Sequence, residues 1–135
     1  MRLVLFALMF FAGAQTPGSL TRWVGTWTWP PPASKDSRPE RLLIWKSKTT
    51  PGALHVFGNA YWYGPLVEYE GEPVRDVHFG KIDADGVPAG DELVLREQGC
   101  EVTLTMAAGE IQASDNMQCG GMNVRFRGTF VRHKG

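Results

Sequence analysis

The chain has 135 residues, of which 43% are hydrophobic and 21% are charged, and its 14 basic residues balance its 14 acidic ones. This length is typical of one globular domain. The 16 Gly and 9 Pro are scattered without a fixed period, which excludes collagen and interrupts the heptads that a coiled coil needs. A formal charge of zero argues against a nucleic-acid-binding protein, because such proteins need surplus Lys and Arg to displace counterions.

The N-terminus has the pattern of a secretory signal peptide. A short basic start at 1–2 is followed by the apolar run LVLFALMFF at 3–11 and by small residues at 12–14. We expect export and cleavage after Ala14, which leaves a single β domain at 15–135, periplasmic or secreted. The run is too short to span a bilayer, so no stable membrane span is expected. The alternative is a membrane anchor or a buried first element.

The two cysteines, Cys100 and Cys119, predict one disulfide. An even number of cysteines in an exported chain indicates pairing in an oxidising compartment. The two residues lie 19 positions apart, and the chain-entropy model gives about 3 kcal/mol for a loop of that size. Two free buried thiols are the alternative. Neither cysteine has a C-x-x-C companion, so no zinc site is expected.

Beyond the N-terminal segment, Gly and Pro interrupt the chain every several residues, and runs of β-branched and aromatic residues lie between them. This spacing leaves no window for an amphipathic helix and predicts an all-β fold. Tight turns are expected at 97–100 and 107–109. An eight-stranded antiparallel barrel is favoured, with a β-sandwich as the alternative. The expected strands cover residues 22–29, 41–47, 53–61, 74–82, 92–98, 101–106, 110–114 and 123–132.

Alternation along the first and last expected strands predicts which side chains face the core. Side chains of a strand alternate between its two faces. The residues that share the apolar face are Trp23, Gly25, Trp27 and Trp29 on the first strand and Val124, Phe126, Gly128 and Phe130 on the last. We expect these faces to meet where the terminal strands close a barrel, although two sheets of a sandwich would explain the pattern nearly as well.

Charges are distributed unevenly along the neutral chain. Residues 68–115 hold twelve acidic and three basic residues, whereas both ends are basic. We expect Arg22, Arg125 and Arg127 to lie near one another on the outer face of paired terminal strands and to bind an anionic partner. The alternative is a solvated surface that keeps the protein soluble.

The sequence contains little that points to catalysis. The histidines His55, His78 and His133 lack metal-binding spacing, although His55 and His78 could meet across neighbouring strands. No G-x-S-x-G, Walker or dinucleotide-binding motif is present. We therefore expect no catalytic residues, no cofactor and no metal.

An acidic segment has both a chemical and a structural interpretation. Glu68, Glu70 and Glu72 alternate and would share one face of an extended segment. There they could flank a sugar or bind a cation. The structural interpretation is an exposed loop bounded by Gly and Pro, and we expect the loop.

A second polar segment precedes Cys119. Asp115 and Asn116 could bind an ion through their side-chain oxygens. They could instead form a bend that the disulfide and the two following glycines, Gly120 and Gly121, hold in place. We expect the bend.

The aromatic residues are the more unusual feature, with 5 Trp, 7 Phe and 3 Tyr. Trp27, Trp45 and Trp62 are candidate binding residues, because aromatic side chains line most apolar pockets. The tryptophans could equally fill a small barrel completely, since eight strands enclose either side chains or one small ligand.

The segment Val24-Gly25-Thr26-Trp27 resembles the G-x-W start of the calycin barrels, the lipocalin and avidin-like group. In that group the Trp packs near the barrel bottom against an Arg from the final strand. The resemblance gives that role to Arg132, which shares the inward parity of its strand, with Arg127 as the second choice.

A longer resemblance covers roughly the last third of the chain. Residues 115–132 follow the pattern D-N-x-x-C-G-G-x-N-V-x-F-x-G-x-Y/F-x-R, with Phe130 where Tyr is usual. The pattern is similar to that of uncharacterised small exported bacterial β proteins, some of which adjoin a lysozyme-inhibitor-type domain. This chain lacks the Cys-rich helical segment of that domain, so the resemblance does not imply inhibition of lysozyme.

Together these features predict an exported, non-enzymatic binding protein that contacts a protein or another envelope component. The alternative is a carrier of a small apolar ligand with a Trp-lined barrel interior. A cavity would favour the carrier, whereas a filled interior with an exposed aromatic or basic patch would favour partner binding. A hydrolase is expected least, because no base, nucleophile and orienting residue can be named together.

Overall fold

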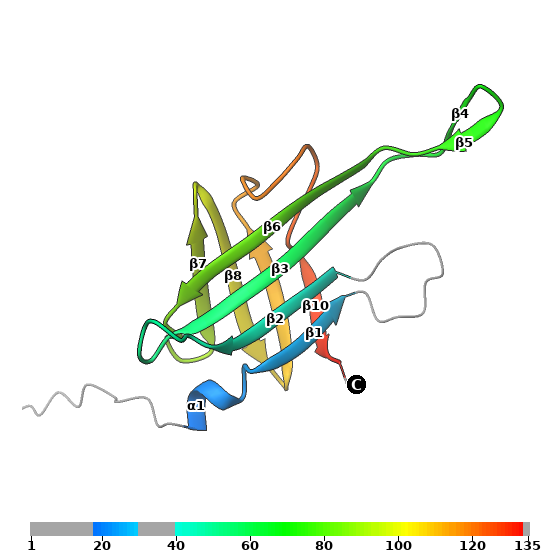
Figure 1. The fold of residues 1–135 in the computed structure, drawn as a ribbon. Coiled ribbons are helices and arrows are strands. Elements are labelled where there is room, and N and C mark those ends of the chain that lie inside the picture. The colour runs from blue at the N-terminus through cyan, green and yellow to red at the C-terminus, as the bar shows by residue number, and fades with distance from the viewer. Residues whose placement is uncertain (1–17, 30–39, 134–135) are drawn as a thin grey trace, which may run out of the picture.

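Figure 1 shows a computed structural model in which eight antiparallel strands curl into a nearly closed barrel and one long hairpin projects from it. The structure describes residues 18–29 and 40–133. The all-β prediction is confirmed, and the architecture is the barrel rather than the sandwich. The predicted signal peptide at 1–14 lies outside the described residues.

The strand order in the main sheet is β6-β3-β2-β1-β10-β9-β8-β7, and β4 and β5 form a separate two-stranded sheet. The elements are α1 (Gly18–Thr21), β1 (Gly25–Trp29), β2 (Glu40–Lys46), β3 (Leu54–Tyr63), β4 (Val67–Tyr69), β5 (Glu72–Val74), β6 (Val77–Gly86), β7 (Glu92–Glu97), β8 (Cys100–Ala107), β9 (Glu110–Asp115) and β10 (Gly128–Arg132). The terminal strands β1 and β10 pair, with Trp27 opposite Arg132. The edge strands β6 and β7 lie next to each other across the remaining seam.

Two-residue turns connect three of the strand pairs. Gln98 and Gly99 have φ angles of 47° and 83°, and Ala108 and Gly109 have 51° and 77°. Two consecutive positive φ angles produce the twist that flanking antiparallel strands need. Both turns expected from the sequence are thus confirmed. The third, between β4 and β5, lies in a segment interpreted above as a loop.

The first strand begins later than expected. Its predicted start at residue 22 is wrong, because hydrogen bonds from the Trp23 amide to the Leu20 carbonyl and from the Val24 amide to the Thr21 carbonyl extend the turn of α1. The strand therefore starts at Gly25. A single helical turn is too short to produce the periodicity that would have predicted it.

Large apolar side chains fill the barrel interior. Trp23, Trp27, Phe126 and Phe130 have no exposed surface, and neither do most of the inward aliphatic residues of the other strands. The inward parity predicted for the last strand agrees with this burial. On the first strand it agrees at Trp27 but not throughout, because Thr28 is buried and Trp29 is only partly buried.

The lower end of the barrel, next to α1, is closed by Arg132. Its guanidinium lies 4.3 Å from the ring centroid of Trp27 and donates hydrogen bonds to the Val24 and Arg22 carbonyls. The contact that the calycin resemblance implies is therefore present. Gly25 lies beneath the guanidinium, where a Cβ atom would be 2.7 Å from a nitrogen of Arg132, so a larger residue would displace the arginine.

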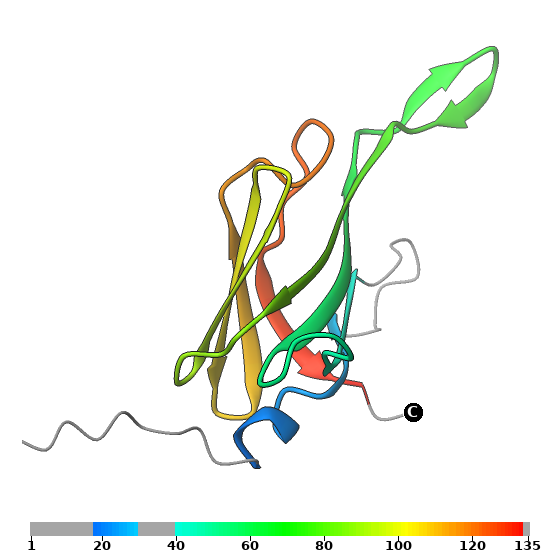
Figure 2. The same cartoon turned by 60° about the vertical axis from the view of Figure 1, so that its left-hand side comes forward.

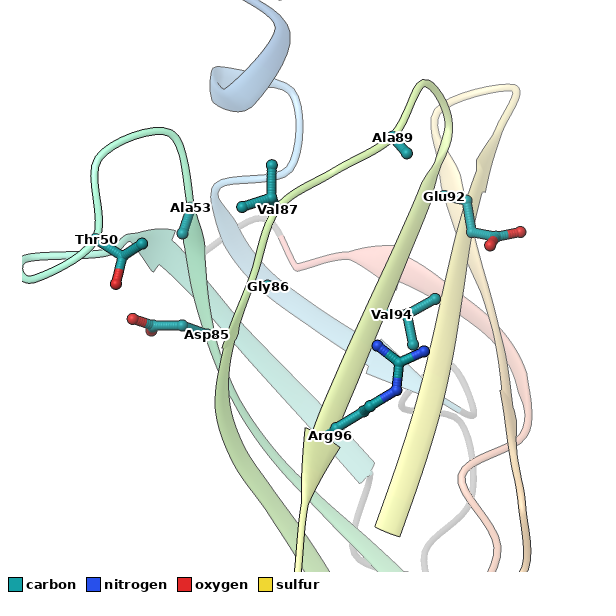
Figure 3. A pocket seen from close by; sticks show the side chains of 9 residues that line it. All are labelled: Thr50, Ala53, Asp85, Gly86, Val87, Ala89, Glu92, Val94 and Arg96. Carbon is teal, nitrogen blue, oxygen red and sulfur yellow. The ribbon is translucent and has the colours of Figure 1, made fainter. Parts of the chain in front are cut away.

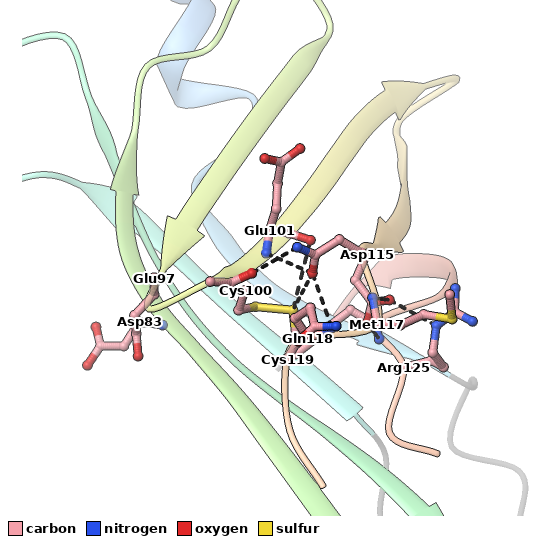
Figure 4. Close-up of a disulfide and its surroundings, with 12 residues drawn as sticks. Asp83, Glu97, Cys100, Glu101, Asp115, Met117, Gln118, Cys119 and Arg125 are labelled. Atoms are coloured by element: carbon pink, nitrogen blue, oxygen red, sulfur yellow. Dashed lines mark hydrogen bonds and ion pairs between the residues drawn. A yellow bond between two sulfur atoms is a disulfide. The ribbon is translucent and has the colours of Figure 1, made fainter. Parts of the chain in front are cut away.

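The segment 116–127, which we call the crossing loop, is tied to the start of β8. Cys100 and Cys119 form the predicted disulfide, and Figure 4 shows the hydrogen bonds around it. Asn116 accepts from the amides of Glu101 and Gln118 and donates to the Gly99 carbonyl. These contacts use the Asn116 side chain to hold a bend.

The last strand is shorter than expected because the Asp115 carboxylate holds the preceding segment. This carboxylate has no exposed surface and accepts hydrogen bonds from the amides of Met117 and Phe126 and from Nε of Arg125. The predicted strand at 123–132 therefore narrows to Gly128–Arg132. The amides of residues 117 and 126 have a side-chain acceptor in place of a strand partner.

The crossing loop also touches the opposite wall at β6. Gly80 and Gly120 form an isolated antiparallel bridge, and the Gly121 amide donates to the Phe79 carbonyl. A Cβ atom on Gly80 would lie 2.1 Å from the Cys119 carbonyl oxygen, so this approach requires glycine. The loop thus spans the upper end of the barrel from β8 to β6.

Candidate functional site

Apolar and aromatic side chains gather on the outside of the sheet formed by β2, β3 and β6. Alternation directs one set of side chains into the core and the other outward. We call the outward apolar set the outer aromatic face: Leu43, Trp45, Phe57, Tyr61, Tyr63, Val77 and Phe79. The ladders bring Leu43 opposite Phe57, Tyr61 opposite Phe79, and Tyr63 opposite Val77. Phe79 is 66% exposed and Trp45 is 38% exposed.

A polar cluster lies beside Trp45 on the same face. His55 Nδ1 is 2.6 Å from an oxygen of Asp85, and its Nε2 contacts Asp83. The Trp45 ring lies 4.8 Å from the imidazole, centroid to centroid. Ser47 donates to the second oxygen of Asp85. The residues on β3 and β6 are neighbours because the ladder places His55 opposite Asp85.

The charge state of this cluster follows from its contacts. Burial lowers the pKa of His55, but the hydrogen bonds to Asp85 and Asp83 outweigh it and raise that pKa above its usual value. The Ser47 hydrogen bond, followed by the contact with His55, holds the pKa of Asp85 below its usual value. In this arrangement carboxylate oxygens engage both ring nitrogens of His55. The Ser47 hydroxyl donates to Asp85 and not to the imidazole.

The ends of β3 and β6 continue beyond the barrel and carry β4 and β5, so that residues 61–79 form a projecting arm (Figure 2). Every residue from 65 to 77 is exposed. Four large apolar side chains of the arm tip are among them: Leu66, Val67, Tyr69 and Val74. The arm therefore offers apolar surface that nothing else in the described chain covers.

The alternating glutamates lie at the tip of the arm. The turn at Glu70 and Gly71 separates Glu68 on β4 from Glu72 on β5. Glu68 pairs with Pro73, whereas Glu72 pairs with Tyr69, so the two carboxylates belong to opposite faces of the hairpin. The sugar or cation interpretation required the three glutamates to share one face, and it loses its geometric basis. The expected loop is also wrong in its form, because the exposed segment is a hairpin of β4 and β5.

A hollow of about 460 Å³ lies between the crossing loop and the base of the arm. We call it the loop groove, and its lining includes Trp62, Met117, Met122, Arg125 and Arg127. The rings of Trp62 and His78 are tilted against each other with their centroids 5.0 Å apart, and His78 Nδ1 hydrogen-bonds to the Met122 carbonyl. The Asp115 contact holds Arg125. Among the described residues Arg127 has neither a hydrogen bond nor an ion pair.

Arg22 lies at the other end of the molecule, and its expected place beside Arg125 and Arg127 is wrong. Arg22 donates to an oxygen of Asp91 at 2.6 Å and to the Gly90 carbonyl. Since Trp27 pairs with Arg132 in the antiparallel ladder, the segment before β1 and the segment before β10 lie at opposite ends. Pairing of the terminal strands separates these arginines instead of joining them.

The three candidate tryptophans have three different environments. Trp27 is fully buried and donates from Nε1 to the Trp23 carbonyl. Trp45 points outward, so its predicted place in a barrel interior is wrong, and Trp62 lines the open loop groove. The prediction failed for Trp45 because it treated all tryptophans alike. Alternation along β2 buries Leu42 and Ile44 and exposes their neighbours, which include Trp45.

His55 and His78, which could have met across neighbouring strands, do not. His55 belongs to the outer face of β3, whereas His78 of β6 contacts the crossing loop. Within the parts of the chain that the structure describes, no three His, Cys, Asp or Glu side chains are grouped to hold a metal.

Two further hollows are open and shallow. Figure 3 shows the one at the seam between β6 and β7, where Asp85 and Arg96 line opposite sides around Gly86. The other, at the lower end, is lined by Arg22, Asp91 and Arg132, whose charges already contact groups of the protein.

Glu40, a residue that sequence reasoning missed, is buried at the start of β2. Its side chain is 5% exposed in total, and one oxygen accepts from the Tyr61 amide at 3.2 Å, while the other has no described partner. Burial raises its pKa to about 7, although the Tyr61 amide and Arg127 favour the charged form. The Glu40 side chain thus supplies a hydrogen-bond acceptor for β3 beside the first residue of β2.

The outer aromatic face and the arm also escaped prediction, although two signals were present. Residues 54–60 alternate between buried and partly exposed positions, and aromatic side chains occupy the odd positions 57, 61 and 63. Glu70-Gly71 between two short β-prone runs is a possible hairpin turn. Which face of an alternating strand is buried cannot be decided from one strand alone.

Among the described residues, no helix has the length and apolar character needed to cross a bilayer. The disulfide is compatible with an oxidising compartment. Comparisons with protein-family models, with curated proteins and with solved structures found no match for this chain.

Proposed function

We propose that this chain is an exported, non-enzymatic binding protein whose outer aromatic face contacts a protein of the cell envelope or the extracellular space. The observation that carries the proposal is the exposure of Trp45 and Phe79 on one continuous side of the sheet. Exposed apolar patches of this kind mark interaction sites, and Trp and Tyr are enriched among the residues that dominate binding.

Two further features support binding rather than chemistry. The polar cluster beside Trp45 engages both nitrogens of His55 with carboxylates, which favours an ion pair over a general base. Trp27, Leu104 and Phe126 pack in the barrel interior, which favours a binding surface on the outside over a carrier of an apolar ligand. The exposed outer aromatic face is therefore the better candidate for binding.

Capture from the native envelope tests the proposal. The immobilised chain is incubated with envelope extract, and the bound proteins are identified by mass spectrometry. We expect one protein to be captured by the parent chain and lost with Trp45→Ala and with Phe79→Ser. Val87→Ser is the matched control, because Val87 is 62% exposed but lies outside the face.

Circular dichroism is used to check that every variant is folded as well as the parent chain. A loss of capture then reports the loss of a contact and not the loss of folded protein. A captured protein that both face variants retain would contradict the proposal. An apolar small molecule released on unfolding the native protein would favour the carrier instead.

A further inference from the structure

The arm is a hairpin without a second layer. Isolated two-stranded hairpins are at best marginally stable in water, and a third strand or a packing surface normally supports them. Tyr69 is 65% exposed and Val67 is 54% exposed, and the ladder places Val67 opposite Val74 on the same side. A surface that covers this apolar side would stabilise the arm.

The tip of the arm is also acidic. Glu68, Glu70, Glu72 and Asp76 surround a single basic residue, Arg75, within the exposed stretch 65–77. The arm tip thus combines an apolar side with an excess of negative charge. A complementary surface has apolar side chains and an excess of positive charge.

The loop groove of the same chain has that composition. Trp62, Met117 and Met122 provide its apolar lining, and Arg125 and Arg127 provide its charge. Met117 and Met122 are 67% and 74% exposed. Asp115 partly offsets Arg125, whereas Arg127 has no ion pair among the described residues. The disulfide and the bridge to Gly80 hold the loop that forms the groove.

We propose that the arm tip of one chain docks in the loop groove of a second copy of this chain, and that the second copy returns the same contact. The groove lies at the base of the arm, next to Trp62, and the tip lies at its far end. Two arms placed antiparallel about a two-fold axis therefore bring each tip to the other groove. Such a reciprocal contact closes on itself and yields a dimer.

This arrangement does not depend on the proposed function, because it uses the arm tip and the groove and leaves Trp45 and the polar cluster free. The interface is formed twice, once at each tip. At each tip, the contact covers the apolar side chains and the charged side chains together. An association that depends on charge complementarity weakens as salt screens it.

Sedimentation equilibrium of the purified chain over a range of protein and salt concentrations tests the proposal. We expect a dimer at low salt whose dissociation constant rises with salt. The arm variant combines Glu70→Lys with Glu72→Lys, and the groove variant is Arg127→Glu. Each alone is expected to raise the dissociation constant at least about tenfold, since like charges then face each other.

The equimolar mixture of the two variants is the decisive measurement. In a dimer with one chain of each kind, the unchanged acidic tip of the groove variant meets the unchanged basic groove of the arm variant. The basic tip of the arm variant meets the acidic groove of the groove variant. Both contacts then join opposite charges, so this mixed dimer is expected. Control variants reverse exposed charges elsewhere: Glu92→Lys with Glu110→Lys against the arm variant, and Lys48→Glu against the groove variant. These controls are expected to dimerise like the parent.

Four outcomes would overturn the proposal. The first is a parent chain that stays monomeric at its highest soluble concentration. The second is a dimer that neither variant weakens at equal folding. The third is a variant mixture that does not restore association. The fourth is an envelope protein that binds the monomeric parent and loses binding with the arm variant, which would assign the tip to a different partner.

Discussion

The lower end of the barrel and the arm both carry aromatic side chains, but these side chains are buried at the lower end and exposed on the arm. Trp23 and Trp27 at the lower end have no exposed surface, whereas Tyr69 and Phe79 of the arm are 65% and 66% exposed. Both regions have alternating strands, but at the lower end the sheet curls so that Arg132 and the opposite wall cover the rings. Alternation assigns side chains to faces, and only a second layer buries a face.

Truncation of Trp27 is expected to have the largest effect on stability. Trp27→Ala removes a fully buried ring and is expected to lower the free energy of unfolding by about 3–5 kcal/mol. Trp45→Ala, at a 38% exposed site, is the control and should cost less than about 1 kcal/mol. Denaturant unfolding followed by circular dichroism measures both. Equal losses for the two variants would contradict the contrast in burial.

The disulfide is expected to have the next largest effect, because it fixes the crossing loop while the arm has no such link. Changing Cys100 and Cys119 together to Ala should cost about 3 kcal/mol, since the bond constrains the unfolded chain. Thermal and denaturant unfolding give the loss. Two reactive thiols in the unfolded, unreduced parent protein would show that the bond is absent.

Glu40 should make stability depend on pH at the point where barrel and arm meet. Its pKa in the folded protein is about 7 against a reference of 4.5, so the folded state binds the proton more tightly than the unfolded state. The stability from this site is therefore complete below pH 4.5 and is lost as pH rises towards 7, by at most about 1.4 kcal/mol per pH unit.

The variant Glu40→Gln isolates this effect, because it keeps an acceptor for the Tyr61 amide but does not titrate. The difference in unfolding free energy between the variant and the parent is expected to move in favour of the variant as pH rises from 4.5 to 7. Unfolding curves at several pH values measure it. Parallel pH profiles would show that the pKa of Glu40 is not raised.

Changes in the arm should have the smallest effect on the stability of the isolated chain. Tyr69→Ser removes an aromatic ring with few neighbours and is expected to change the free energy of unfolding by less than about 0.5 kcal/mol. Amide hydrogen exchange should be faster at 66–75 than in β2 or β8, because exposed two-stranded hydrogen bonds open locally. A loss comparable with that of Trp27→Ala would show that the isolated arm has a packing partner.

Several features of the fold could be predicted from local patterns. The turns at Gln98-Gly99 and Ala108-Gly109 were predictable because glycine at the second position permits the positive φ angles that are observed. The disulfide followed from the number of cysteines and the export pattern. The contact between Arg132 and Trp27 came from the calycin resemblance and not from periodicity.

Features of the candidate site depended on register, and they could not be predicted. Asp83 and Asp85 alternate in the sequence, but their shared partner His55 lies about thirty positions earlier and becomes a neighbour through the β3–β6 ladder. The separation of Arg22 from Arg127 is likewise a property of the β1–β10 ladder. The arm escaped prediction because acidic residues beside Gly and Pro are also typical of loops.

The sequence by itself determined the local properties of this protein: which residues form strands, which side chains share a face, where tight turns occur and which cysteines can pair. The tertiary structure decided which faces are covered, which charges lie at the same end and which strands extend beyond the barrel. The physical reason is that alternation and turn geometry arise within a few neighbouring residues. Burial and proximity arise only when strands distant in the sequence pair in one register and close around a core.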